Sequence, residues 1–264
     1  MVVQTVPGVL ARIVEHKRIE LAERRWRTRL LEREAERRSG ARRDFAAALT
    51  TIAPAIIAEI KKASPSRGVL IDEFDPSRIA RAYDRGGAAA VSVLTDSKFF
   101  QGSLADLEAA RQEVKTPVLR KDFTLDEFHV IEAAAHGADA ILLIVAILDP
   151  DALRRLREAA ERYRMAVLVE VHDEAELKKA VDSGARIIGV NNRNLIDFTV
   201  SLATCEQLAP KIPDGIIRVA ESGIHSSADI QRLQRFGYQG FLVGEHLMTS
   251  PSPEKALQAL RGLA

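Results

Sequence analysis

The sequence has few of the features that mark secreted or membrane proteins. It contains a single cysteine, Cys205, so no disulfide can form within the chain, which fits a reducing compartment. The longest apolar run, Ala140–Leu148, is much shorter than the ~20 residues of a membrane-spanning helix. Residues 1–18 have no basic stretch followed by a long apolar run and so predict no secretory signal. We therefore expect a cytoplasmic protein that does not bind membranes.

Signatures of metal and cofactor binding are also missing. The six histidines are not clustered at the spacing of metal ligands, and His172 and His225 are expected in loops. No glycine-rich dinucleotide-binding motif follows the first predicted strand. Cys205 is expected in a helix after the sixth predicted strand and has no predicted role. We expect neither a metal nor an organic cofactor.

The net charge of the whole chain is only +1, but the charges are unevenly distributed. Residues 17–43 contain eleven Lys or Arg and five Asp or Glu. A basic segment can bind nucleic acid or steer an anionic substrate. Here acidic and aliphatic residues alternate with the arginines at helical spacing, which favours an amphipathic helix with a solvated basic face. We expect no nucleic-acid partner.

From about Ala53 onward, short apolar runs rich in β-branched residues alternate with polar amphipathic stretches. The eight apolar runs begin 21 to 34 residues apart, which is the length of one strand-plus-helix unit. Several of the intervening stretches open with Asp, Ser or Thr and close on Gly, as helices do. The predicted strands begin at Ala55, Ala89, Pro117, Ala138, Met165, Ile187, Ile216 and Gly240.

Eight such units in succession predict a (β/α)8 TIM barrel of the α/β class. Strands that are apolar on both faces indicate a parallel sheet covered by helices, and the lack of a long linker favours a closed barrel over an open sheet. Residues 1–264 are predicted to form a single domain, with an N-terminal helical extension (1–52) before the barrel (53–264). In the extension we expect one long helix from about Val9 to Arg38 and a short one near Phe45, packed across one end of the barrel.

Charged residues interrupt the apolar pattern where five of the predicted strands end. In a TIM barrel these ends meet at one mouth, where active sites lie. One such charge usually begins a solvated loop, but charges of both signs at the same end of several strands indicate a polar site. Asp122 is expected to point away from this site and to serve as a structural partner, because neighbours in a strand face opposite sides. The predicted site contains Glu59, Lys61, Lys121, Glu170, Asn191, Arg193 and Glu221.

Small-residue turns end the seventh and eighth predicted strands. The first contains Ser222 and Gly223, and the second contains Gly244 and Glu245. Turns of this kind next to a helix N-terminus bind phosphate through backbone N–H groups. One turn alone is equally consistent with an ordinary loop, whereas two turns on adjacent strands favour phosphate. We therefore expect a small phosphorylated molecule as the partner.

Taken in order, these motifs resemble those of the indole-3-glycerol phosphate synthase family. The first strand reads AEIKKASPSRG, the second VSVLTDSKFFQGSLADL, the third LRKDF and the fifth LVEV. GVNNRNL, VAESGI and FLVGEHLM match the sixth, seventh and eighth strands. The resemblance runs from about Val9 to the C-terminus and keeps the order of the motifs, so it is highly specific.

The resemblance implies the substrate 1-(o-carboxyphenylamino)-1-deoxyribulose 5-phosphate, which carries two anionic groups and a ketone. It implies attack of the anthranilate ring carbon on this ketone, followed by loss of CO2 and water. Lys121 would protonate the developing alkoxide, and Glu170 would stabilise the cationic iminium. Glu59 and Lys61 are the candidates for dehydration, with their division of roles left open. Lys61 would also serve the carboxylate and phosphate side of the substrate.

Further substrate contacts follow from the same resemblance. Asn191 and Glu221 would hold the substrate hydroxyls and the amine, and Phe100 and Phe123 would pack on the anthranilate ring. Glu245 departs from the small residue of some relatives, so only its backbone amide would contact phosphate. The predicted substrate- and phosphate-binding residues are Ser64, Phe100, Phe123, Arg193, Ser222, Gly223, Gly244 and Glu245.

Two alternative functions remain open at this point. Another phosphate-binding barrel, such as phosphoribosylanthranilate isomerase, would use a Cys or Asp acid–base pair at the strand ends, where this sequence has Lys and Glu. A non-catalytic scaffold that binds nucleic acid through the basic segment would be expected to have lost Lys121 or Glu170, and both are present. We expect a monomer or a weak homodimer.

Overall fold

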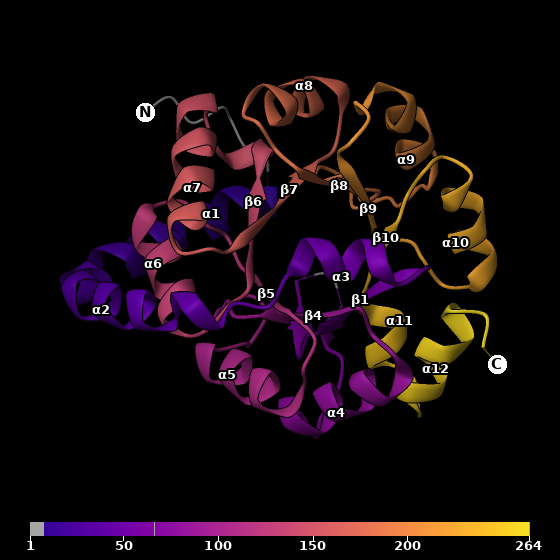
Figure 1. Cartoon of the computed structure of the whole chain (residues 1–264), viewed down its shortest axis with the longest axis horizontal. Helices are drawn as coiled ribbons and strands as arrows, with labels where there is room; N and C mark the ends of the chain where they lie inside the picture. Colours follow the sequence, from indigo (N-terminus) through magenta and orange to yellow (C-terminus); the bar gives the residue numbers. More distant parts are fainter. Residues whose placement is uncertain (1–7, 66, 264) are drawn as a thin grey trace.

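The computed structural model describes residues 8–65 and 67–263, and its centre is a closed barrel of eight parallel strands (Figure 1). The order around the barrel is β1-β10-β9-β8-β7-β6-β5-β4. The prediction of a TIM barrel is thus confirmed, and every strand begins within two residues of its predicted start. The strands are β1 Ala55–Ile60, β4 Ala90–Leu94, β5 Val118–Lys121, β6 Ala140–Ile144, β7 Ala166–Val171, β8 Ile187–Asn191, β9 Ile217–Glu221 and β10 Gly240–Val243.

Helices alternate with the strands and surround the barrel, as Figure 1 shows. Most of them begin at an Asp or Ser whose side chain accepts a hydrogen bond from an amide of the first turn, as the sequence predicts. A short antiparallel pair, β2 (Ala63–Ser64) and β3 (Gly68–Val69), follows β1. The helices are α4 Pro76–Gly86, α5 Leu104–Glu113, α6 Glu127–Ala135, α7 Pro150–Arg162, α8 Glu174–Asp182, α9 Ala203–Leu208, α10 Ser227–Gln234, α11 Glu245–Met248 and α12 Pro253–Leu260.

Alternate residues of each strand face the inside of the barrel and its helical shell. Ile57 and Leu119 belong to the inner apolar cluster, whereas Ile56 and Val118 pack outward against the helices. Side chains in a strand alternate with a period of two, so the inner face of each strand can be followed to its end. On β5 the next inward residue after Leu119 is Lys121. The strand pattern therefore places charged side chains at the carboxyl ends of the strands, next to the buried apolar layer inside the barrel.

The N-terminal extension is helical, but it does not contain the single long helix expected from Val9 to Arg38. Helix α1 (Gly8–Arg24) and helix α2 (Thr28–Arg38) are separated by a 3-10 turn, η1 (Arg25–Arg27). The short helix expected near Phe45 is α3 (Phe45–Thr51), which begins at the capping residue Asp44. The break at η1 lets the two longer helices follow different surfaces of the barrel.

These three helices contact both ends and one side of the barrel, not one end alone. Phe45 and Leu49 of α3 are fully buried in the inner apolar cluster, and α3 lies across the amino-terminal end of the strands (Figure 1). Helix α2 packs against α6 on the side of the barrel. Leu10 and Ile13 of α1 line the cavity at the opposite end. The extension is thus part of both the barrel floor and the wall of the cavity.

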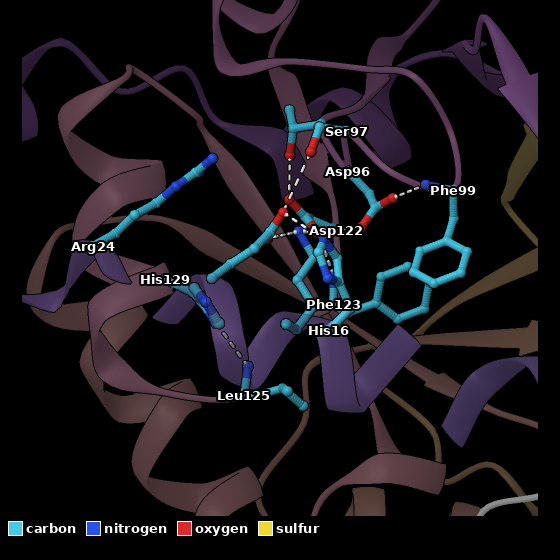
Figure 2. Close-up of polar contacts among 12 residues, drawn as sticks. His16, Arg24, Asp96, Ser97, Phe99, Asp122, Phe123, Leu125 and His129 are labelled. Carbon is cyan, nitrogen blue, oxygen red and sulfur yellow. Dashed lines mark hydrogen bonds and ion pairs between the residues drawn. The ribbon is translucent and has the colours of Figure 1, made fainter. Parts of the chain in front are cut away.

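Helix α1 is fixed to the barrel by a buried ionic cluster around Lys17, and Figure 2 shows Asp96 and Asp122, two carboxylates of this cluster. The Lys17 ammonium lies 2.8 Å from Glu20, 2.9 Å from Asp122 and 3.2 Å from Asp96. Asp122 also accepts a hydrogen bond from Arg120, on the outer face of β5. Asp122 is therefore a structural partner that faces away from Lys121, as predicted.

The rest of the basic segment is only partly solvated. Arg42 donates hydrogen bonds to the carbonyls of Ala134 and Tyr163, and Arg43 donates to those of Arg111 and Thr116. The arginines near the helix ends are exposed by contrast, with side-chain exposures of 64% for Arg25 and 73% for Arg37. Several basic residues therefore serve the packing of the extension.

Across residues 8–65 and 67–263, no helix combines the length and the apolar character needed to cross a membrane. The expectation of no secretory signal in residues 1–18 falls partly on residues 1–7, which lie outside the described residues.

Candidate active site

A cavity of about 570 Å³ opens at the carboxyl ends of the strands. It is lined by every residue that the sequence predicts for the site, although these residues come from seven strands and the loops that follow them. The inward-facing positions of β1, β5, β7 and β9 supply charged groups, and that of β8 supplies the amide of Asn191. The predicted residues at the wall are Glu59, Lys61, Ser64, Phe100, Lys121, Phe123, Glu170, Asn191, Arg193, Glu221, Ser222, Gly223, Gly244 and Glu245.

Lys121 lies between two carboxylates. Its ammonium is 3.1 Å from Glu170 Oε2 and 3.2 Å from Glu221 Oε2. Both glutamates are buried, with 4% and 1% of their surface exposed. Asn191 donates a hydrogen bond of 3.1 Å to the other oxygen of Glu170, and its own side-chain oxygen accepts from the backbone N–H of Arg193. The side chain of Asn191 is thus held in one orientation beside Glu170.

The two carboxyls that share Lys121 have different proton affinities. Burial alone would raise the pKa of Glu170, but Lys121, His172 and Asn191 together hold that pKa well below its usual range. Burial raises the pKa of Glu221 to about 7, against the opposing effect of Lys121 and with a further increase from Glu170. Burial would lower the pKa of Lys121, yet its neighbouring carboxylates raise it above the ordinary value. Lys121 therefore stays an ammonium. Of its two neighbours, Glu170 stays ionised, and Glu221 titrates near neutral pH.

A second charged pair lies at the end of β1. The ammonium of Lys61 is 2.7 Å from Glu59 Oε1, and Glu59 is buried. This carboxylate occupies the space beside Gly244, where an added Cβ would come within 2.2 Å of Glu59 Oε1. A side chain at position 244 would therefore displace the Glu59 carboxylate. A general acid and a general base are therefore available side by side.

The turns after β9 and β10 form one end of the cavity. Ser222 and Gly223 both have positive φ, at 63° and 77°, which turns the chain sharply after β9. Glu245 is the first residue of α11, so its backbone N–H has no partner within the helix. Its carboxylate lies 3.0 Å from Arg67 and is therefore paired, which reduces its repulsion of an anion.

Another part of the wall is apolar and aromatic. The rings of Phe100 and Phe123 are 6.0 Å apart at their centroids and inclined by 39°. Leu10 and Ile13 of α1 line the same cavity, together with Leu142 from the inner layer of the barrel. A site with an aromatic wall, two lysines and anion-binding turns can bind a molecule with an aryl ring and anionic groups.

Metal ligands are not gathered at this cavity. No group of three or more His, Cys, Asp or Glu in the described part of the chain has a geometry that could hold a metal ion. Cys205 is buried in α9, where its thiol approaches the carbonyl of Val190, and burial raises the pKa of this thiol to about 12. The cysteine lies in a helix after the sixth barrel strand, as expected, and takes no part in the cavity wall.

Comparison with known proteins identifies the family. The family model of indole-3-glycerol phosphate synthase matches residues 10–260. The chain belongs to the indole-3-glycerol phosphate synthase family. The synthase of Koribacter versatilis is 49% identical over 258 residues, covering 97% of this chain and 99% of the relative. That of Chlorobium limicola is 50% identical over 246 residues, covering 92% and 95%.

Membership of the indole-3-glycerol phosphate synthase family fixes the class of reaction. The enzyme is a carboxy-lyase of tryptophan biosynthesis, and its substrate is phosphorylated. This decides against the isomerase and the non-catalytic scaffold that the sequence had left open. The match covers α1 as well as the barrel, so the extension is part of the family's fold.

Solved structures with little sequence identity share the barrel. An N-acetylmannosamine-6-phosphate 2-epimerase from Clostridium perfringens aligns with a TM-score of 0.62 at 16% identity, covering 82% of this chain and 96% of that one. A mutant tryptophan synthase α-subunit from Pyrococcus furiosus aligns with a TM-score of 0.61 at 14% identity, covering 79% and 98%. These likenesses concern the fold alone.

The structure adds residues to the synthase site that the sequence did not single out. Arg67 forms an ion pair with Glu245. In the sequence, the only sign of a role for Arg67 was its position three residues after Ser64. His172 was expected only as a loop residue, yet it contacts Glu170, two positions before it. His225 is also in a loop and lines the cavity.

Proposed function

We propose that the chain converts 1-(o-carboxyphenylamino)-1-deoxyribulose 5-phosphate to indole-3-glycerol phosphate, with release of CO2 and water. The observation that carries the proposal is the Lys121 ammonium, which lies within 3.2 Å of two buried carboxylates at the wall of the cavity. The neighbouring carboxylates keep this lysine charged, so it is available as an acid inside a largely desolvated site.

Ring closure is the first step in this proposal. The anthranilate carbon that bears the carboxylate attacks the ketone carbon of the sugar chain, and Lys121 protonates the oxygen as it becomes an alkoxide. The attack leaves a cationic iminium at the nitrogen. Glu170, which is held as a carboxylate, stabilises this positive charge. Loss of CO2 from the same carbon then restores the aromatic ring.

Dehydration completes the indole. The hydroxyl leaves as water with a proton from an acid, and a base removes a proton from the adjacent carbon. Lys61 and Glu59, whose charged groups are 2.7 Å apart, are the pair we assign to this step without dividing their roles. Two protons are added and one is removed, so each turnover takes up one proton as the carboxylate leaves as CO2.

The remaining predicted residues hold the two ends of the substrate. We assign the phosphate to the turns after β9 and β10 and to the loop after β1. The anthranilate ring is assigned to the aromatic pair Phe100 and Phe123, whose ring centroids are 6.0 Å apart. Asn191 and Glu221 are assigned to the hydroxyls and the amine. The proposed phosphate- and substrate-binding residues are Ser64, Arg193, Ser222, Gly223, Gly244 and the amide of Glu245.

We propose that residues 1–264 act as one domain, with the extension (1–52) and the barrel (53–264) folding together. The contacts of α3 with the floor of the barrel support this division. We further propose a cytoplasmic protein that is a monomer or weak homodimer and binds no nucleic acid. The hydrogen bonds of Arg42 and Arg43 to barrel carbonyls support a packing role for part of the basic segment.

The proposed reaction is tested by mixing the purified protein with the carboxyphenylamino-deoxyribulose phosphate and following indole fluorescence and CO2 release together. We expect both products in equal amounts. A dephosphorylated substrate analogue should react with a kcat/KM lower by about a hundredfold or more, because the turns after β9 and β10 then have no anion to bind. A folded protein that yields neither product would refute the proposed function.

A further inference from the structure

The two carboxylates that share Lys121 differ in the number of donors they receive. Glu170 accepts hydrogen bonds from Lys121 and Asn191, each at 3.1 Å, and its Oε1 also lies 3.2 Å from the ring nitrogen Nε2 of His172, an ion pair without hydrogen-bond geometry. Glu221 receives Lys121 at 3.2 Å through Oε2, while its Oε1 is buried without a hydrogen-bond partner among the described residues. The surroundings of Lys121 are therefore strongly asymmetric.

His172 is held in place from its other side. Its Nδ1 lies 3.0 Å from Glu176 Oε2, and the same oxygen accepts the backbone N–H of His172 at 2.8 Å. Glu176 is in the first turn of α8, whose capping residue is Asp173. Only 11% of the His172 side chain is exposed, so the ring is fixed between a site carboxylate and a helix.

The contacts of the ring determine its charge. Each ring nitrogen lies close to a carboxylate oxygen, Nδ1 at 3.0 Å from Glu176 and Nε2 at 3.2 Å from Glu170, so the two negative charges favour the positively charged imidazolium. In agreement, burial would lower the pKa of His172, but Glu170 and Glu176 raise that pKa to about 10. The other charged groups nearby are Lys121, beyond Glu170, and Asp173 and Arg193, on the wall of an adjoining hollow.

The charges around Lys121 do not cancel if every carboxyl is ionised. Glu170, Glu176 and Glu221 face two cations, Lys121 and His172, in a buried setting. A surplus negative charge in such a place is costly and is reduced by protonating the carboxyl with the fewest donors. That carboxyl is Glu221, whose pKa burial raises to about 7.

We propose that His172 is a positioning residue that confines the negative charge of the Lys121 carboxylate pair to Glu170, leaving Glu221 as the member that exchanges a proton. The inference rests on the proposed function, in which Lys121 and Glu170 act on the substrate. His172 itself touches no reacting atom. It acts through Glu170, and Glu176 acts through His172.

The first test measures the charge of His172 without turnover. Protein labelled with ¹⁵N-histidine is observed by NMR from pH 6 to 9, and the His172 signal is assigned by its loss in His172→Gln. We expect both ring nitrogens to stay protonated over this range. A neutral ring at pH 7.5 would overturn the proposal. If His172→Gln does not fold, the signal is assigned instead by its shift in Glu176→Gln.

The second test is the pH profile of kcat. Removing the cation in His172→Gln should raise the pKa of the coupled Glu170–Glu221 pair, so activity should be lost on the acid side at a pH at least about one unit higher than in the wild type. The value of KM should change less than about threefold, because His172 does not contact substrate. An acid limb that does not move would contradict the proposal, even if kcat falls at every pH.

His136→Gln is a matched control. His136 also pairs with a glutamate through Nδ1, at 3.1 Å from Glu108, but it is at the end of α6 and outside the cavity wall. Its profile should match the wild type. Absence of product from the wild-type enzyme would refute the proposed function alone, since the NMR result does not depend on catalysis.

Discussion

The absence of a side chain at Gly189 on β8 leaves the space that the Glu221 carboxylate occupies. A Cβ at this position would come within 2.1 Å of Glu221 Oε1 and 3.2 Å of Leu168. The nearer atom is the end of a flexible side chain, so an added methyl group should displace the carboxylate and leave the strand in place. Gly189 thus keeps Glu221 beside Lys121 without touching substrate itself.

We therefore expect Gly189→Ala to lower kcat by about tenfold or more while reducing the melting temperature only slightly. Steady-state kinetics and thermal unfolding measure the two effects. The control is Gly40→Ala, because an added Cβ at Gly40 meets nothing within 4 Å. Equal kcat values for the two variants would show that the position of Glu221 does not matter.

Glu221 should also reduce stability at high pH. Its carboxyl has a pKa of about 7 in the folded protein against 4.5 for an ordinary glutamate, so the unfolded chain releases this proton first as pH rises. Glu221 therefore does not change the free energy of unfolding below pH 4.5. Between pH 4.5 and pH 7 it lowers this free energy progressively, and above pH 7 the reduction is complete. Glu221→Gln should therefore be more stable than the wild type at pH 8.5, by roughly 1–3 kcal/mol.

Urea denaturation at pH 8.5 and pH 4.5 tests this expectation, with the gain vanishing at the lower pH. The same variant should lose most of its activity, because it lacks a catalytic carboxyl. Glu221 thus lowers the stability of the fold at high pH but is needed for activity. A variant less stable than the wild type at pH 8.5 would mean that Glu221 is ionised and well paired at neutral pH.

At the scale of residues, the sequence predicted the inward charges well. The alternation in β5 placed Lys121 inward and Asp122 outward, and both positions are confirmed. It could not predict the contact of His172 with Glu170, because this depends on how α8 starts after β7. The pairing of Arg67 with Glu245 joins loops far apart in sequence and was equally inaccessible.

Among the elements, helix α1 is held against the barrel largely by the ion pairs of one side chain, Lys17. Lys17 is the cation that faces Glu20, Asp96 and Asp122 at 2.8–3.2 Å, and Figure 2 shows Asp96 and Asp122 gathered at this cluster. The amides of Phe99 and Phe123 bind the same two aspartates. The cluster therefore connects α1 to both loops that carry the aromatic wall.

Lys17→Met should destabilise the protein by about 2–5 kcal/mol, because it leaves the buried carboxylate of Asp96 without its cation and removes one of the two cations of Asp122. It should also raise KM, since Leu10 and Ile13 of α1 line the cavity. Arg18→Met is the control, because Arg18 is exposed on the same helix. Equal stability of the two variants in urea would exclude an anchoring role for Lys17.

At the scale of elements, hydrophobic periodicity located all eight strands but missed the break between α1 and α2. The sequence of η1, Arg-Trp-Arg, contains neither Gly nor Pro, so nothing local marked an interruption. The break follows from packing, because α1 lies at the cavity and α2 against α6. Packing against distant parts of the chain leaves no mark in the helical spacing of apolar residues, so the break could not be predicted from it.

The molecule as a whole closes its barrel at one end and opens it at the other, and the extension contributes to both. Phe45 and Leu49 seal the floor, while α1 forms part of the wall at the mouth. The repeat of eight strand–helix units was enough to predict the barrel. The path of the extension along its side was not predictable, because Arg42 and Arg43 bind carbonyls more than 60 positions away.

Removal of residues 1–14 should leave a folded barrel, because the Lys17 ion pairs, α2 and α3 are retained. It should raise KM for the substrate by about tenfold or more, since the apolar wall formed by Leu10 and Ile13 is lost. Circular dichroism checks the fold, and steady-state kinetics check the affinity. A truncated protein with unchanged KM would show that α1 takes no part in binding.

Lys121 is the acid that protonates the ketone oxygen of the substrate as the ring closes. The most direct test of this role is indole fluorescence from the carboxyphenylamino-deoxyribulose phosphate with wild type and Lys121→Ala side by side, each at saturating substrate. We expect product from the wild type and a kcat about a thousandfold lower in the variant, with its fold intact. A Lys121→Ala enzyme that turns over within about tenfold of the wild type would contradict this role.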